Sequence, residues 1–580
     1  MEMVPYVSLQ ARTQAARLLV RALKKTVPHL DFSEKKMRLQ DVRDKRLGDL
    51  SSNVCFEACG RDRSLGNPIQ LAESLVSSIR LSNDALFEKV EAANGYVNFF
   101  FSSTFYNRVL IELAGHSSYG IGDSGKKKTV IVEFSSPNIG KPMHIGHIRS
   151  TILGDSLARL YRTQGYRVIS TNYLCEAGLQ TAKLLLAVKQ FGREGILTEN
   201  DLLKYYVKIH AEMETHPELE KRARALVEGM ESGDALVLKD LKSVRDTSCL
   251  PFERNYQLLG ITFDEQVFDS DFVSEGKKLV SEAVKKNVAF KDTGGEIVGN
   301  LEPLGLPNLV ILRSNGTTLY STRDLALAAR DYRKYKYAFR LYVTASEQNL
   351  HFQQVFALLL ALKKPFADRL MHLGFGLIFL EEGRISTRKG HVVLLEDVLQ
   401  TAKEYALKEV QQRQRYTPKE AEAIAHSVGI ASVKYSVLKV TAEKDITFRL
   451  KDAVRFDGNT AAYLQYTIVR AKNIFRKGNV SEIPALPKAL PMHDQEKRLI
   501  ALLSSYPDVL SAAAHSRAPH AVCTYAFSLA TQFSLFYDAC PVLKAESEES
   551  KAFRLHLVKS TETVLESALD VLGITVPERM

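Results

Sequence analysis

An α/β protein of several domains is the fold class that this sequence predicts, with a doubly wound parallel sheet in its central domain. Thr129–Phe134 is a β-rich run that ends at Ser135-Ser136-Pro137-Asn138, a cluster that stops strands and starts turns. Apolar residues then recur mostly at spacings of three and four up to Gly165, which indicates a helix with one buried face. Arg167–Tyr173 is a second strand-like run. Strand, helix and strand in this order predict a βαβ unit with a right-handed crossover.

The segment His144-Ile145-Gly146-His147 stands where the first predicted strand leads into the predicted helix. Ligands of such sheets bind beyond the carboxyl ends of the strands, where backbone amides at a helix N-terminus attract anions. Gly146 lets a nucleotide approach the backbone, and the imidazoles of His144 and His147, on one helical turn, can both donate hydrogen bonds to phosphate oxygens. The segment therefore predicts a site for the triphosphate of ATP.

Two histidines at this spacing also fit ordinary surface residues or half of a metal site. A metal site is disfavoured because no glutamate follows the first histidine, as zincins require, and because the six cysteines form no CxxC pair. We therefore expect no metal ligands in this chain.

A second candidate for phosphate binding lies far downstream, in the glycine-bounded stretch Glu381–Gly390. It contains the cations Arg384, Arg388 and Lys389 and the hydroxyls of Ser386 and Thr387, and such a loop can close over a polyphosphate. The alternative is a solvated surface turn.

Together these strings resemble the arginyl type of class I aminoacyl-tRNA synthetases. Ser135–Met143 leads into the HIGH motif, Arg384–Gly390 follows as the second signature, and Arg313–Asp324 with Ser346–Phe352 is similar to the amino-acid pocket of that family. The similarity extends over nearly the whole chain. It implies a Rossmann-like, HUP-type catalytic domain with an insertion, an N-terminal α+β domain and a C-terminal all-α bundle that binds the anticodon.

The resemblance also implies roles for individual residues. The catalytic set is His144, His147, Lys141, Arg384, Ser386 and Arg388, and the ATP-binding set is His144, Gly146, His147, Lys141, His372, Gly374, Phe375 and Ser386. In the family the strand and turn at His372–Gly376 lie beneath the adenine, where glycines allow a close approach. Taken alone, that segment is simply the end of a strand.

Five residues are implied to surround the arginine substrate: Glu133, Asn138, Tyr320, Asp324 and Gln348. Tyr320 and Asp324 are expected nearest the guanidinium, because a planar, permanently charged fork is best held by a carboxylate and a hydroxyl in fixed positions. Considered singly, Asp324 also fits the cap of a helix expected at Leu325–Tyr332, Glu133 a strand end, Asn138 a turn and Gln348 the start of a helix.

The sequence departs from the common class I pattern in two places. Thr387 replaces the second lysine of the KMSKS signature, and Lys141 matches the upstream lysine that is thought to compensate in many arginyl enzymes, so we expect it beside the α-phosphate. Glu176-Ala177-Gly178 stands where relatives carry Asp-Trp-Gly or Asp-Ala-Gly. The resemblance therefore does not specify how this part of the pocket closes.

The implied reaction joins L-arginine to the 3′ end of tRNA(Arg) through an arginyl-adenylate. ATP with Mg²⁺ enters as a substrate, no permanently bound cofactor is expected, and the enzyme is expected to be a monomer. Two other classes stay open: a catalytically silent tRNA-binding paralogue and a different nucleotidyltransferase with a HIGH motif.

Composition fits an intracellular protein that acts on a polyanion. The chain has 580 residues, room for about three or four domains, and a formal net charge of +11. Six cysteines without a disulfide or zinc framework indicate a reducing compartment, and no apolar run approaches the ~20 residues that a membrane span needs.

We expect the protein to be located in the cytoplasm. The mitochondrial matrix is the alternative, because Met1–Leu30 is rich in Arg and Lys, although Leu19, Leu23 and Val27 fit the stripe of a structural first helix.

Composition and the resemblance divide the chain into five parts. We predict a domain that binds the tRNA elbow (1–114), a linker (115–128), the catalytic domain (129–390) with a connective insertion at about 190–299, a helical region that contacts the tRNA stem (391–452), and the anticodon-binding domain (453–580). Charged helices are expected at Tyr205–Met230 and Ala235–Arg245 in the insertion. The candidate tRNA contacts are Tyr463, Gln465, Tyr466, Arg470 and Asn53; the helical spacing of the aromatics also fits a buried core.

Overall fold

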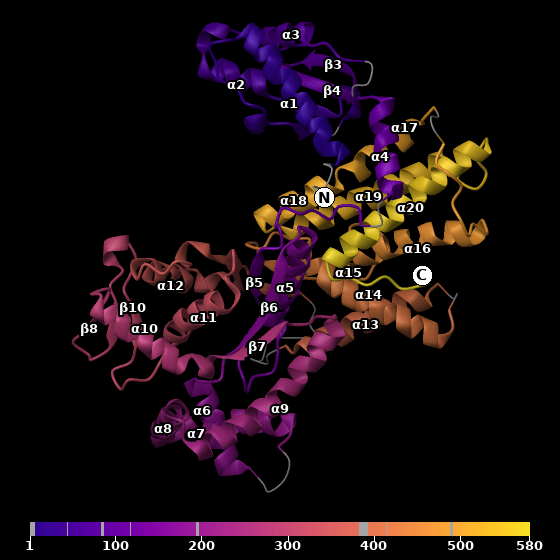
Figure 1. The fold of residues 1–580 in the computed structure, drawn as a ribbon. Helices are drawn as coiled ribbons and strands as arrows, with labels where there is room; N and C mark the ends of the chain where they lie inside the picture. Colours follow the sequence, from indigo (N-terminus) through magenta and orange to yellow (C-terminus); the bar gives the residue numbers. More distant parts are fainter. Residues whose placement is uncertain are drawn as a thin grey trace. The chain divides into compact units, whose positions relative to one another are not determined.

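The computed structural model of the chain describes residues 6–42, 44–82, 86–115, 118–192, 197–381, 393–413, 416–487 and 491–580. The chain forms two compact units, and Figure 1 shows its helices and strands. Unit 1 comprises Met1–Gly122, Leu464–Ala512 and Thr524–Ala568, and unit 2 comprises Asp123–Tyr463, Ala513–Cys523 and Leu569–Met580. The first boundary between them falls inside the predicted linker.

The centre of unit 2 is a five-stranded sheet in the order β12-β11-β5-β6-β7, and all its pairings are parallel. Its strands are β5 (Thr129–Glu133), β6 (Arg167–Leu174), β7 (Glu265–Phe268), β11 (Phe339–Ala345) and β12 (Leu370–Phe375). The order reverses beside β5, because β6 adds on one side of it and β11 on the other. Such a switch point is where ligands of doubly wound sheets bind.

Helix α5 (Ile145–Thr163) connects β5 to β6, which confirms the predicted βαβ unit. Its Gly154 allows close packing: a Cβ there would lie 2.2 Å from the Cβ of Phe134, just after β5. Side chains alternate along a strand, so Ile131 points to the opposite face, where it joins a core built with residues of α10, α11 and α12. Both faces of the sheet are therefore covered.

The remaining elements of unit 2 surround this sheet. The helices are α6 (Leu179–Phe191), α7 (Glu199–Thr215), α8 (Glu218–Ser232), α9 (Ala235–Leu259), α10 (Val273–Lys285), α11 (Tyr320–Tyr335), α12 (Asn349–Ala361), α13 (Leu395–Gln411), α14 (Pro418–Leu438) and α15 (Leu450–Ala453), with 3₁₀ turns η4 (Asp269–Phe272), η5 (Glu302–Leu304), η6 (Ser346–Gln348) and η7 (Ala367–Arg369). The strands β8 (Ala289–Lys291), β9 (Ile297–Gly299) and β10 (Leu309–Leu312) form an antiparallel sheet, and β13 (Ile378–Leu380) pairs with β14 (Ile446–Phe448).

The predicted insertion at 190–299 is not continuous, because β7 within that range belongs to the central sheet, beside β6. Helices α6, α7, α8 and α9 contact one another and form one helical group in Figure 1. The single helix expected at Tyr205–Met230 is wrong: α7 ends at Thr215 and α8 begins at Glu218, with Pro217 between them. Proline has no N–H for the helical hydrogen bond, so it interrupts the pattern without changing the apolar spacing.

Unit 1 contains an N-terminal α+β part and C-terminal helices. The first part has α1 (Val7–Thr26), α2 (Val54–Arg61), α3 (Pro68–Ser78), α4 (Ser103–Gly115), the 3₁₀ turns η1 (Glu34–Lys36), η2 (Lys45–Leu47) and η3 (Arg63–Leu65), and an antiparallel sheet ordered β1 (Gln40–Asp41), β2 (Leu50–Ser52), β4 (Tyr96–Phe101), β3 (Phe87–Ala93). Leu19, Leu23 and Val27 are buried, which confirms the predicted apolar stripe of the first helix. Most of the C-terminal helices also belong to this unit: α16 (Ala461–Lys477), α17 (Asp494–Ser504), α18 (Tyr506–Ser516), α19 (Pro519–Ala539) and α20 (Glu548–Val571).

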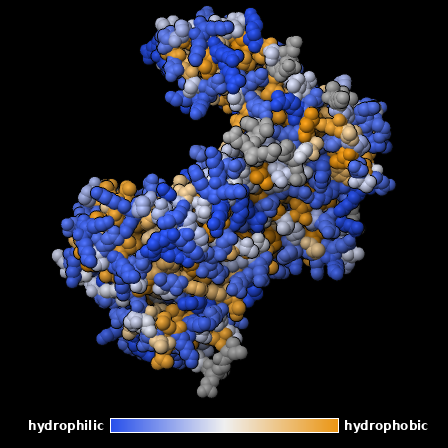
Figure 2. All heavy atoms as spheres, in the orientation of Figure 1, coloured by the Kyte–Doolittle hydropathy of each residue, from blue (hydrophilic) through white to orange (hydrophobic). Residues whose placement is uncertain are grey.

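Hydrophilic residues cover most of the face drawn in Figure 2, and hydrophobic residues lie there in scattered groups. Across the ranges that the structure describes, none of the helices combines the length and the apolar character that crossing a bilayer requires. The six cysteines are all free thiols.

Candidate active site

A cavity of about 670 Å³ lies at the carboxyl ends of the central strands in unit 2. Nine of the predicted site residues line it: Glu133, Asn138, His144, Gly146, His147, Tyr320, Asp324, Gln348 and Phe375. They come from the ends of β5 and β12, the loop before α5, the start of α5, the start of α11 and the turn before α12. The fold thus brings four of the predicted ATP-binding residues and all five predicted arginine-binding residues to one cavity at the switch point of the sheet.

The loop from β5 to α5 is held in an unusual backbone conformation. Ser135 and Ser136 have φ angles of 72° and 47°, which residues with a side chain rarely adopt. The Ser135 N–H donates to Ser150 Oγ at 2.9 Å, and the Ser136 N–H donates to Asn172 Oδ1 at 3.1 Å. These contacts from α5 and β6 fix the entry to the HIGH motif.

His144 and His147 close the N-terminus of α5 by a reciprocal cap. The Gly146 N–H donates to Nδ1 of His144 at 3.1 Å, and the His144 N–H donates to Nδ1 of His147 at 3.2 Å. Burial lowers the pKa of both rings, that of His147 to about 3, and the charge of Lys141 adds to the effect. Both rings are therefore neutral with the proton on Nε2, so each Nε2–H is a donor suited to a phosphate oxygen.

Gly146 has a second reason to be glycine. A Cβ at this position would lie 2.8 Å from Cε1 of His144, so a larger residue would push the ring out of its capping position. The predicted reason, close approach of a nucleotide to the backbone, is compatible with this one.

Glu133 belongs to a buried charge cluster as well as to the cavity. Arg340 on β11 is fully buried and forms ion pairs with Glu133 and with Asp331 on α11. Burial raises the pKa of Glu133 to about 7, against the opposing effect of Arg340, and the charges of Asp324 and Asp331 add to the rise. Glu133 therefore reaches the cavity as a carboxyl group that is already bound to Arg340.

Asp324 is the fifth residue of α11 and lies in its interior, so its alternative assignment as a helix cap is wrong. Oδ2 of Asp324 is 2.6 Å from Nε2 of His351, on the first turn of α12. The hydrogen bond and the charge of Asp324 raise the pKa of His351 despite its burial, which acts in the opposite direction. The sequence reasoning missed His351; its spacing of one helical turn after Gln348 was the available signal.

Tyr320 begins α11 at the rim of the same cavity, and burial raises the pKa of its hydroxyl to about 12, so it stays protonated. The guanidinium of Arg323 lies 5.1 Å from the centre of its ring, and Nε of Arg323 is 3.0 Å from Oδ2 of the buried Asp269. A Cβ at Gly178 would lie 3.6 Å from the Tyr320 hydroxyl oxygen. The wall that carries Tyr320 is thus built against the Glu176-Ala177-Gly178 segment.

The structure accounts for Glu176, the residue that departs from the family pattern. Its side chain is fully buried; Arg245 on α9 donates from Nε to Oε2 at 2.7 Å, and Ser270 donates to Oε1 at 2.6 Å. Burial raises the pKa of Glu176, and the bonds from Arg245 and Ser270 oppose that rise. The longer carboxylate therefore has its own partners in α9 and η4.

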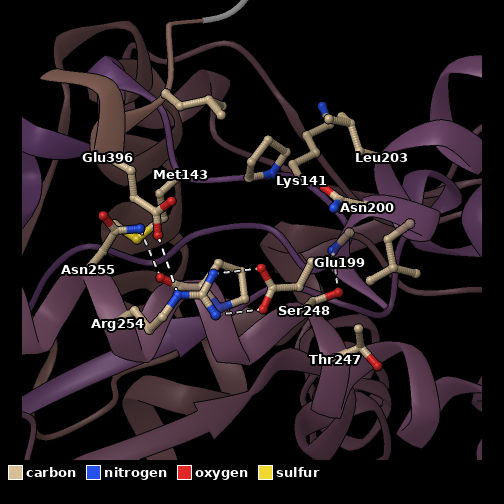
Figure 3. A pocket seen from close by; sticks show the side chains of 15 residues that line it. Lys141, Met143, Glu199, Asn200, Leu203, Thr247, Ser248, Arg254, Asn255 and Glu396 are labelled. Atoms are coloured by element: carbon tan, nitrogen blue, oxygen red, sulfur yellow. Dashed lines mark hydrogen bonds and ion pairs between the residues drawn. The ribbon is translucent and has the colours of Figure 1, made fainter. Parts of the chain in front are cut away.

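Lys141 does not line the cavity of the HIGH motif. It lines a neighbouring cavity of about 160 Å³, shown in Figure 3, between α7, α9 and the start of α13. There Arg254 donates to both carboxylate oxygens of Glu199, at 2.7 and 2.6 Å, and lies 3.5 Å from Glu396. The charge of Lys141 still lowers the pKa values of His144 and His147, so it acts within electrostatic range of the HIGH motif.

The predicted residues Arg384, Ser386 and Arg388 of the second signature lie outside the described residues. The chain that follows them is tied directly to the HIGH motif. The Ile145 N–H donates to the Val393 carbonyl and the Leu395 N–H to the Met143 carbonyl, both at 3.0 Å. The segment Val393–Leu395 and the HIGH motif, far apart in the sequence, are therefore hydrogen-bonded side by side.

Of the three predicted ATP-binding residues on β12, only one lines the cavity. Phe375 lines the cavity, whereas Nε2 of His372 lies 2.8 Å from Thr344 Oγ1 and its ring stacks on Phe352. His372 and Gly374 are not among the described residues that line the cavity. Gly374 makes room for protein: a Cβ there would lie 2.5 Å from Oδ1 of Asn349.

The candidate tRNA contacts differ in accessibility. In unit 1, Gln465 is completely buried, so its assignment as an RNA contact is wrong in this structure: position 465 faces the helical core. Tyr466 on the same helix is 36% exposed. Arg470 lies 4.1 Å from the Tyr537 ring centre and 3.6 Å from Asp538, and Asn53 stands half-buried at the start of α2. Tyr463, described with unit 2, is half-buried.

The comparisons with known proteins agree with this architecture. Residues 111–450 match the model for the catalytic domain of class I (R) tRNA synthetases, residues 13–101 the arginyl tRNA synthetase N-terminal domain and residues 464–580 the DALR anticodon binding domain. The fold and the site therefore define a class I aminoacyl-tRNA synthetase. The arginine–tRNA ligase of Clostridioides difficile is 37% identical over 565 residues, which cover 96% of this chain and 98% of the relative. This chain belongs to the arginyl-tRNA synthetase family.

Two further comparisons extend over most of the chain. The arginine–tRNA ligase of Clostridium perfringens is 35% identical over 534 residues, 91% of this chain and 93% of that protein. The arginyl-tRNA synthetase of Thermus thermophilus shares the fold with a TM-score of 0.82 and 24% identity, over 98% of this chain and 100% of that one.

Proposed function

We propose that this chain uses ATP to activate L-arginine as arginyl-adenylate and then transfers the arginyl group to the 3′ end of tRNA(Arg). The observation that carries the proposal is the shared cavity, which is lined by the two neutral imidazole donors of the HIGH motif and by Asp324 and Tyr320. Membership of the family and relatives that are arginine–tRNA ligases support it.

Two groups of lining residues suit the two parts of the reaction. The Asp324 carboxylate and the Tyr320 hydroxyl can hold a guanidinium, and the paired Glu133 adds negative potential. Arginine held in this way presents its carboxylate to the α-phosphate of ATP. That carboxylate attacks phosphorus, the bond to the pyrophosphate oxygen breaks, and pyrophosphate leaves.

His144 and His147 stabilise charge on the phosphate oxygens through their Nε2–H groups, with no covalent enzyme intermediate. Mg²⁺ enters with ATP as a substrate. Among the described residues there is no group of three or more His, Cys, Asp or Glu side chains that could hold a metal ion. Lys141, Arg384, Ser386 and Arg388 stay the proposed partners of the phosphates.

Arginine-dependent exchange of pyrophosphate into ATP tests the proposed function. We expect exchange with arginine in the presence of tRNA, little without tRNA, and none with lysine, because a point charge would leave part of the buried acidic pocket unpaired. No exchange under any of these conditions would instead favour a silent tRNA-binding paralogue.

Arginine binding is expected to strengthen with rising pH. Below its pKa of about 7, Glu133 is protonated and neutral, and above it the carboxylate adds a negative charge beside Asp324. A cationic ligand is therefore bound less well at low pH. The KM for arginine should fall as the pH rises from about 6 to about 8, by at most about tenfold per unit. Kinetics at saturating ATP measure it, and Glu133→Gln should flatten the profile. A KM for arginine that stays constant over this range in the wild type would contradict the prediction.

The terminal domains are proposed to hold the tRNA. Residues 1–114 would contact the elbow, 391–452 the stem and 453–580 the anticodon, with Tyr463, Tyr466, Arg470 and Asn53 as candidate contacts; the matches of both terminal regions support this division. Ribonuclease footprinting of bound tRNA would locate these contacts.

We also propose that the protein is a monomer, which light scattering would test. The proposed location is the cytoplasm, with the mitochondrial matrix as the alternative. Free thiols throughout the cysteine set favour a reducing compartment.

A further inference from the structure

Asp324 has one partner inside the protein that the proposed function leaves without a role. Nε2 of His351 lies 2.6 Å from Oδ2 of Asp324, and both residues line the cavity. Oδ1 of Asp324 makes no hydrogen bond with the residues that the structure describes. One carboxylate oxygen is therefore held by the protein, and the other is left for a ligand.

We infer that His351 is a positioning residue for arginine specificity, which holds the Asp324 carboxylate in the orientation that a guanidinium requires. The inference rests on the proposed function, because it assumes that Asp324 receives the arginine side chain. A carboxylate turns freely about its last bond, whereas a planar fork needs both oxygens at fixed positions. A hydrogen bond to one oxygen removes that freedom before the ligand arrives.

The surroundings of His351 hold its ring in place. His351 lies on the first turn of α12, one turn after Gln348, which lines the same cavity. Its ring packs edge-to-face on Phe352 at 5.2 Å, and Phe352 stacks on His372, which contacts Thr344 of β11. A chain of packed rings thus connects the donor to the central sheet.

The proposed role of His351 depends on its N–H donor and not on its size. His351→Leu fills similar space without a donor, whereas His351→Gln keeps an N–H donor at a similar reach. We expect His351→Leu to raise the KM for arginine by about tenfold, the lower range for hydrogen bonds to charged groups. His351→Gln should recover most of this loss. The KM for ATP and the kcat at saturating arginine should stay close to the wild-type values in both variants.

The experiment is a double-mutant cycle in the full-length enzyme, read by arginine-dependent pyrophosphate exchange with tRNA. Its members are the wild type, His351→Leu, His351→Gln, Asp324→Asn and the double variant His351→Leu/Asp324→Asn. If His351 acts through Asp324, its replacement costs nothing further once Asp324 is asparagine. His426→Gln, at an exposed position of α14, is the control for a histidine outside the site and should behave as the wild type. His351→Ala replaces the leucine variant if circular dichroism shows that the latter is not folded.

The outcomes distinguish failure of the proposed function, of the assignment of Asp324 and of the role of His351. A wild type without arginine-dependent exchange overturns the proposed function and this inference with it. An active wild type with an unaffected Asp324→Asn variant overturns the assignment of Asp324. The remaining outcomes concern an impaired Asp324→Asn variant. The proposed role of His351 is wrong if His351→Leu leaves the KM for arginine unchanged or raises the KM values for ATP and arginine equally. It is also wrong if His351→Leu adds its full loss to that of Asp324→Asn.

Discussion

Replacing Asp324 with alanine is expected to lower kcat/KM for arginine by about 150-fold, a loss on the order of 3 kcal/mol, because it removes a charge-assisted contact from a largely buried site. The Asp324 side chain is 11% exposed, so water can replace little of the lost interaction. Steady-state pyrophosphate exchange over a range of arginine concentrations measures the effect. We expect it mainly in KM, because the side chain of arginine separates its guanidinium from the carboxylate that reacts.

The control for this variant is Asp271→Ala, an exposed aspartate in η4 of the same unit. It removes the same charge without touching the cavity and should leave kcat/KM for arginine within about twofold of the wild type, as surface substitutions usually do. Arginine kinetics that are unchanged by Asp324→Ala would reject the proposed recognition of the guanidinium.

Replacing Arg340 with methionine is expected to destabilise unit 2 by about 3–5 kcal/mol, because the buried Glu133 would lose its cation and the buried Asp331 would keep only Arg330. The cluster ties β5, β11 and α11 together at the site, so arginine binding should fail with it. Urea unfolding followed by circular dichroism measures the loss. Since the chain has two units, the transition that belongs to unit 2 has to be resolved first.

The matched control is Arg333→Met, which removes another arginine of unit 2, on α11. Arg333 pairs with Glu275, and both side chains are partly exposed, at 60% and 27%. Such a surface pair contributes at most about 1 kcal/mol. Restoring stability by adding Glu133→Gln and Asp331→Asn to Arg340→Met would identify the unpaired charges as the cause. A stability of Arg340→Met equal to that of Arg333→Met would contradict the prediction.

Local patterns predicted the elements nearest the site. The β-rich run at Thr129, the apolar period after His147 and the run at Arg167 became β5, α5 and β6, because each pattern matches the period of the element that forms. The break at Pro217 went unrecognised, since the charged residues on both sides keep a helical spacing. The assignment of β7 to the sheet was beyond reach too, because a strand of four residues gains its stability from its neighbour β6.

Motifs likewise located the site but not its internal contacts. The predicted residues Glu133, Asn138, His144, Tyr320, Asp324 and Gln348 meet in one cavity, because parallel strands end at the same edge of the sheet. Gln465 was misjudged for the opposite reason: helical spacing shows which residues share a face, but not which face packs against the other helices.

Short stretches of sequence were enough to predict the class of fold, the position of the turn before α5 and the family, because their residues act mainly on immediate neighbours. Three pairs became visible only in the folded chain: Glu133 with Arg340, Asp324 with His351, and Glu176 with Arg245. Each of these pairs joins residues from different elements. Charges buried in a medium of low polarity need partners, and which partner is within reach is settled by how the elements pack.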